Sequence, residues 1–126
     1  MQIAAVFIAA VGLILLSTLC LSIPNTATSG KLYRNSIMGL RTTQTKKSDA
    51  AWLQGHKEAA PILKVTGMLV IALTAVLLIS AFFVQDVPFV SLTTGAISYV
   101  LAIGGIIWAA VIADKAAKKV NNQVAA

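Results

Sequence analysis

Three long apolar runs restrict what this chain can fold into. They cover about residues 3–23, 62–84 and 90–113, and each has the roughly 20 apolar residues that an α-helix needs to cross a bilayer. Charged residues make up 11% of the chain, whereas a soluble domain carries about a quarter. We therefore expect an all-α integral membrane protein with three transmembrane helices, forming a single membrane domain over residues 1–126.

The positions of the basic residues predict the orientation of the chain. Seven of the ten lysines and arginines lie in or beside the connection 25–61, and the other three lie in the tail 114–126. Because positively charged segments stay on the cytoplasmic side, we expect the N-terminus outside, the C-terminus inside, and the connection and tail in the cytoplasm. The first run has no basic residue ahead of it, so we expect a retained span rather than a cleaved signal peptide.

Proline and polar residues predict where the elements end. The pair Pro24-Asn25 predicts a turn after the first span. Pro61 stands where a first-turn proline is tolerated at the start of the second span. We expect the tail to continue the third helix and to fray after Lys119.

The connection contains one segment that predicts a short helix, about residues 48–60. Ser48 is a good N-cap, and Asp49 suits the positive end of the helix dipole. Trp52 and His56 are four residues apart and share a face. Because Trp favours the headgroup level, we expect this interfacial helix to lie along the cytoplasmic surface before the chain turns into the second span.

The polar residues ahead of this helix have two alternative interpretations. In the first, Asn35, Arg41, Thr42 and Thr45 fold over the helix start and present a guanidinium, hydroxyls and amides to one anion, such as a lipid phosphate or an acidic peptide terminus. In the second, the same groups satisfy one another and only fold the loop onto the bundle, because polar groups beside a membrane need partners. Gly39 permits a tight bend between them.

The sequence offers little for chemistry other than binding. The single histidine cannot form a metal site, and a hydrogen bond from its ring to the loop is favoured over a pH sensor. Cys20 has no Cys or His partner. No Asp, Glu, Arg or His lies deep in a span, where proton relays place them. We expect no enzyme activity, no metal and no cofactor, and no nucleic-acid partner, because the basic loop lacks base-stacking aromatics.

Small residues recur in the spans, several of them at four-residue spacing, and they let helices approach closely in lipid. They are interpreted either as packing within the chain or as a face for a partner or a second copy. The residues are Ala5, Ala9 and Gly12 in the first span, Gly67 in the second, and Gly105, Ala109 and Ala113 in the third.

Nine residues of the loop form a spaced pattern, Asn-x3-Gly-Leu-Arg-Thr-x2-Thr-x2-Ser-x3-Trp-x3-His, from Asn35 to His56. This pattern resembles the signature of the SdpI family of bacterial membrane proteins. Two departures are Leu40, where the family has isoleucine, and Ala59-Ala60-Pro61, where the family tends to have glycine after the histidine. The candidate partner- or anion-binding residues are Asn35, Gly39, Arg41, Thr42, Thr45, Ser48, Trp52 and His56.

The resemblance implies a function for the chain. The family's named member is an immunity protein that protects a bacterium from its own membrane-active toxin and recruits a transcriptional repressor to the membrane; this chain resembles its signature-bearing C-terminal part. We therefore expect an SdpI-like plasma-membrane protein that acts in immunity or signalling through its loop. A small accessory subunit of a larger membrane complex is the alternative, and a homo-oligomeric transporter is a third. The expected partners are membrane lipid and either a membrane-active peptide or a larger membrane protein complex.

Overall fold

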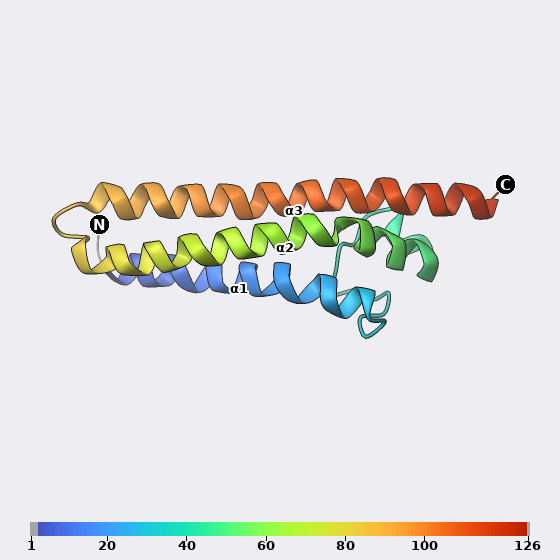
Figure 1. Cartoon of the computed structure of the whole chain (residues 1–126), viewed down its shortest axis with the longest axis horizontal. Coiled ribbons are helices and arrows are strands. Elements are labelled where there is room, and N and C mark those ends of the chain that lie inside the picture. Colours follow the sequence, from blue (N-terminus) through green and yellow to red (C-terminus); the bar gives the residue numbers. More distant parts are fainter. Residues whose placement is uncertain (1–2, 126) are drawn as a thin grey trace.

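Three long helices make up most of the computed structural model, which describes residues 3–125 (Figure 1). They are α1 (Ile3–Thr28), α2 (Asp49–Ser80) and α3 (Pro88–Ala125), and the short 3-10 helices η1 (Thr45–Lys47) and η2 (Ala81–Phe83) flank α2. Each long helix is long and apolar enough to cross a membrane. The described residues contain no strand, so the prediction of an all-α chain with three potential spans is confirmed.

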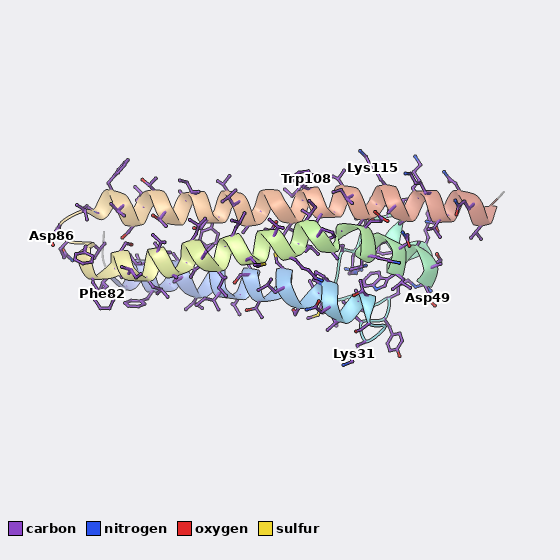
Figure 2. All side chains as sticks on the ribbon, viewed as in Figure 1. Lys31, Asp49, Phe82, Asp86, Trp108 and Lys115 are labelled. Carbon is purple, nitrogen blue, oxygen red and sulfur yellow. The ribbon has the colours of Figure 1, made fainter. Side chains whose placement is uncertain are left out.

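Helix α2 lies between α1 and α3, and the chain runs up, down and up along the bundle (Figure 1). The α2–α3 connection lies at the same end as the start of α1. The longer connection between α1 and α2 lies at the opposite end, beside the last turns of α3. Lys31, Asp49 and Lys115 lie toward that end, while Asp86 lies at the other (Figure 2). The two basic regions of the sequence therefore gather at one end of the bundle.

The interior is built from aliphatic and small side chains. One cluster joins Val6 and Leu13 of α1 to Val70 and Leu77 of α2 and Ala102 of α3. Many large apolar side chains point outward instead, and that surface suits a bilayer, where lipid tails are as apolar as the side chains. Ile8, for example, is 74% exposed.

Most of the small residues noted in the sequence pack within the chain. Ala109 and Ala113 are fully buried, Gly67 lies against Leu21 of α1, and Gly105 lies against the Thr66 side chain of α2. Without these glycines the helix axes would have to move apart. Ala5 of α1 is exposed, so at that position the small residue does not pack within the chain.

The turn predicted at Pro24-Asn25 is wrong, because α1 continues through Pro24 to Thr28. The Thr28 hydroxyl donates to the Pro24 carbonyl at 2.6 Å. The helix ends at Thr28, and Gly30 follows it with a left-handed φ of 79°. The N–H of Lys31 then donates to the carbonyl of Thr26 at 2.9 Å, which is the Schellman arrangement that closes many helices.

The predicted turn between the interfacial helix and the second span is also wrong. Residues Asp49–Ser80 form one continuous helix with Pro61 inside it. Figure 1 shows α2 bending in its green part, near residue 60, which is the usual response of a helix to an internal proline. The tail does not fray after Lys119 but stays helical to Ala125.

Candidate functional site

The connecting loop (residues 29–48) is folded against α2 by an aromatic pair. Trp52 and His56 are both buried, and their ring centroids lie 4.3 Å apart. The indole N–H of Trp52 donates to the carbonyl of Leu32 at 3.1 Å. The start of α2 therefore holds the first part of the loop through a side-chain bond as well as by packing.

Gly39 lies directly over this aromatic pair. Its φ is 108°, and a Cβ added there would stand 2.7 Å from the Trp52 ring and 2.9 Å from His56 Nε2. A side chain at this position would face both a backbone penalty and an overlap with the two rings. The bend predicted at Gly39 is present, and the structure shows that the missing side chain makes room for the rings.

His56 connects the loop to α2 through both ring nitrogens. Its Nε2 accepts the backbone N–H of Leu40 at 2.8 Å, and its Nδ1 lies 2.8 Å from the Trp52 carbonyl. Nδ1 must then carry the proton, so the ring is neutral. His56 precedes the predicted second span, and burial lowers the pKa of the imidazole although the bond to the Trp52 carbonyl raises it. The ring-to-loop hydrogen bond favoured by the sequence is present.

Asn35 and Arg41 close the outer part of the loop. The Asn35 Oδ1 accepts the N–H groups of Ile37 and Met38 at 2.8 and 2.7 Å, an Asx turn that fixes the chain ahead of Gly39. Arg41 Nε donates to the Asn35 carbonyl at 3.1 Å. The Asn35 side chain is therefore used inside the loop, while the outer nitrogens of Arg41 have no partner within residues 3–125.

The threonines predicted to face an anion turn inward. Thr45 is fully buried, donates its hydroxyl to the Leu40 carbonyl at 2.7 Å and accepts the Thr42 N–H at 2.9 Å. The Thr42 hydroxyl lies 3.2 Å from that of Thr45. These two side chains satisfy loop groups and hold the turn, as the second interpretation of the loop requires.

Ser48 caps α2 and also reaches the tail. Its hydroxyl accepts the N–H of Ala51 at 3.0 Å, which confirms the predicted N-cap, and it donates to Oδ1 of Asn121 at 3.3 Å. Asn121 Nδ2 in turn donates to the Gln44 carbonyl at 3.0 Å. The end of α3 is therefore joined to the loop by hydrogen bonds.

Asp114 provides a second connection between α3 and the loop, one residue past the predicted third span. Its Oδ1 accepts the N–H of Gln44 at 3.1 Å. The neighbouring Thr42 hydroxyl and the Gln44 N–H lower the pKa of the carboxyl. The group is therefore a carboxylate at neutral pH, as a strong acceptor for a loop amide should be.

Four residues that build this region are absent from the candidate set predicted from the sequence: Gln44, Gly55, Asp114 and Asn121. A Cβ on Gly55 would stand 2.8 Å from Thr45 Cγ2 and 2.9 Å from the Ala113 carbonyl, so this glycine lets α2, the loop and α3 meet. One signal was available: Asp114, the buried Ala117 and Asn121 are spaced three and four residues apart, which puts them on one helix face.

A groove of about 560 Å³ lies between the loop and α3. Basic side chains line one part of it and apolar side chains line the part that continues along the predicted third span. The lining residues are Arg41, Thr42, Thr43 and Lys46 from the loop and Ile107, Ala110, Val111, Asp114 and Lys115 from α3.

Comparison with known proteins identifies the family of the chain. The family model described as "SdpI/YfhL protein family" matches residues 31–113, which include nearly all of the loop, the whole of α2, and α3 as far as Ala113. The chain belongs to the SdpI/YfhL family. It has no match among curated proteins or among solved structures.

Family membership and the three apolar helices make this chain a multi-pass membrane protein of the SdpI/YfhL family. All eight residues predicted as a binding set lie in the region that the family model covers. The structure brings them together, but Asn35, Thr45, Ser48 and His56 are used in holding the loop. Arg41 is the member of the set that keeps unused donors at an exposed position.

Proposed function

We propose that this SdpI/YfhL protein is a non-enzymatic protein of the bacterial plasma membrane that acts in immunity or signalling. Its N-terminus lies outside, its C-terminus inside, and its loop binds an anionic partner on the cytoplasmic side. The fold supports this proposal because the loop and the tail, which together carry eight of the ten basic residues of the sequence, lie at one end of the bundle (Figure 1).

The observation that carries the proposal is the state of Arg41. The loop fixes this side chain through its Nε bond to Asn35, and its outer nitrogens remain available. Lys46 and Lys115 line the same groove. Within residues 3–125 one ion pair forms, between Arg34 and Asp49 at 3.3 Å. Arg41, Lys46 and Lys115 therefore form no ion pair with a carboxylate of the described residues.

Arg41→Gln tests the proposal in cells. Cells without the native gene would express the wild type, Arg41→Gln or Lys57→Gln, and growth would be followed under challenge with a membrane-active peptide. Lys57 is a matched control because it is an exposed cation on α2 that does not line this groove. We expect protection by the wild type and by Lys57→Gln, and loss of protection by Arg41→Gln.

Membrane levels of the three proteins decide how that result is interpreted. Equal levels with selective loss of protection support a binding role for Arg41. A drop in the level of Arg41→Gln supports the interpretation that the loop is only structural. Protection by Arg41→Gln equal to that of the wild type contradicts the proposal.

A second candidate, an accessory subunit of a larger membrane complex, is favoured by a different feature. An apolar groove of about 390 Å³ lies between α2 and α3 beside Pro61 and Trp108. At Gly104 in this groove, no atom lies within 4 Å of the position of an added Cβ, so a partner helix has room to approach. Mild extraction followed by mass analysis tests it: a complex retained by the wild type should be lost on Gly104→Leu.

A further inference from the structure

We propose that the groove between the loop and α3 binds one anionic phospholipid. Its phosphate lies beside Arg41 and Lys46, and one acyl chain lies along Ile107 and Val111. This inference rests on the proposed function, because it names the ligand class of the same cationic loop. It follows from the charges of the groove, its apolar floor and the fixed position of Arg41.

The charges select a headgroup with net negative charge. Three cations line the groove against one carboxylate, that of Asp114, and Asp114 Oδ1 already accepts the N–H of Gln44. The Thr43 hydroxyl adds a further donor at the loop wall. A guanidinium with two free N–H₂ groups suits two phosphate oxygens. The Asp114 carboxylate would repel a phosphate placed against it, so the phosphate belongs on the Arg41 and Lys46 side.

The floor of the groove suits an acyl chain rather than water. Ile107 and Val111 are 59% and 46% exposed, lie one helical turn apart and face the same groove. From Ile107 to Lys115 α3 rises about 12 Å, a length that takes a ligand from the first acyl carbons to the headgroup. Trp108 is 60% exposed at this level, and tryptophan is enriched where the acyl region meets the headgroups.

Hydrogen bonds within the loop fix its basic side of the groove before a ligand binds. Arg41 is fixed by Asn35, and the turn that follows is fixed by the buried Thr45 hydroxyl and by the Gln44–Asp114 bond. A receptor that is already ordered loses less conformational entropy on binding. A polybasic segment without this support would attract anionic membranes generally, whereas a fixed groove holds one lipid.

Native mass spectrometry of the full chain from detergent micelles tests the inference. The probes are phosphatidylglycerol, phosphatidylethanolamine and phosphatidylcholine with identical acyl chains. We expect the wild type to retain one phosphatidylglycerol in preference to the other two. Arg41→Gln should weaken that binding about fivefold, the value for one basic residue at a membrane surface, and adding Lys46→Gln should weaken it further. Lys57→Gln should bind as the wild type does.

Three results would overturn the inference. The first is equal retention of the three lipids by the wild type. The second is an equal loss of phosphatidylglycerol binding in Arg41→Gln and Lys57→Gln. The third is full displacement of phosphatidylglycerol by millimolar inorganic phosphate or by an acidic peptide, since either result would identify a site that does not use the apolar floor.

The lipid measurement and the growth assay fail in different ways. Absence of lipid preference together with loss of protection in Arg41→Gln would overturn the lipid inference and leave the proposed function in place. Selective loss of lipid in Arg41→Gln with full protection would leave the lipid site and overturn the proposed function. Gel filtration of each variant checks that folding is unchanged.

Discussion

The Nε2 atom of His56 accepts the backbone N–H of Leu40 at 2.8 Å, across 16 residues of sequence. This bond joins a buried position of α2 to the loop that carries Arg41. It requires a neutral ring, because a protonated imidazole has no lone pair for the amide. The geometry of the candidate site therefore depends on the protonation state of the chain's single histidine.

Acid should weaken the folded state through His56. An unfolded histidine has a pKa of about 6.5, and burial lowers the folded pKa of His56 below that value. The contribution of His56 to the free energy of unfolding is therefore complete above about pH 6.5. Below it the unfolded state takes up the proton first, so the free energy of unfolding should fall by at most about 1.4 kcal/mol per pH unit until the folded pKa is passed.

Unfolding of the purified protein in mixed micelles between pH 5 and 8 measures this dependence. His56→Gln is the control, since it removes the one histidine while offering a polar side chain of similar length. The variant should be less stable at pH 8 and should lose the slope below pH 6.5. The same slope in wild type and variant would show that another group is responsible.

Gly39→Ala should destabilise the protein more than Gly30→Ala does. Both glycines have positive φ, 108° and 79°, so both variants pay a backbone cost of roughly 1–2 kcal/mol. A Cβ at Gly39 also meets the Trp52 and His56 rings, whereas no atom lies within 4 Å of one at Gly30. We expect a further cost of about 1–3 kcal/mol at Gly39, measured as a lower unfolding midpoint. Equal losses would contradict the packing argument.

Residues close in sequence could be predicted, and residues joined across the fold could not. The apolar runs, the bend at Gly39 and the Ser48 cap each follow from local rules, and they are present. The contacts of Asn121 lie 73 and 77 residues away, at Ser48 and Gln44. Nothing near Asn121 in the sequence indicates those partners.

The errors at Pro24 and in α2 have a common physical origin. Proline predicts a helix end where water can satisfy the freed backbone groups. Beside lipid a broken helix leaves those groups without partners, so the helix continues and bends instead. Pro24 and Pro61 are both internal for this reason. The loop residues were predicted as a set because of their spacing, but which of them remain free depends on hydrogen bonds that form only in the fold.

Asp114→Ala and Asn121→Ala should release the loop from α3 in a coupled way. Both residues bond to Gln44, one at its N–H and the other at its carbonyl. Each variant should cost about 1 kcal/mol, the usual net value of such a bond. Once one bond is lost, the remaining bond restrains the loop less. The double variant should therefore lose less stability than the sum of the two single losses.

Hydrogen exchange of the amides of residues 42–48 provides the measurement for this pair. Faster exchange in each variant, confined to the loop, supports a local connection. Asn25→Ala is a suitable control, because its exposed side chain has no hydrogen bond within residues 3–125. Additive costs in the double variant would mean that the two bonds act independently.

Gly105→Ala and Gly104→Ala should affect stability differently, although the two glycines are neighbours on α3. A Cβ at Gly105 meets the Oγ1, Cγ2 and Cβ atoms of Thr66, and one at Gly104 meets nothing within 4 Å. The Thr66 Cβ belongs to the rigid base of its side chain, so α2 and α3 must separate to admit Gly105→Ala. In lipid, helix association depends on close packing, and we expect a loss of about 1–3 kcal/mol. Gly104→Ala should leave stability unchanged or raise it by up to about 1 kcal/mol through helix propensity. Unfolding by SDS titration compares the stability of the two variants. An equal loss at Gly104 and Gly105 would contradict the packing argument. It would mean that backbone flexibility of α3, rather than its contact with Thr66, sets the stability of the bundle.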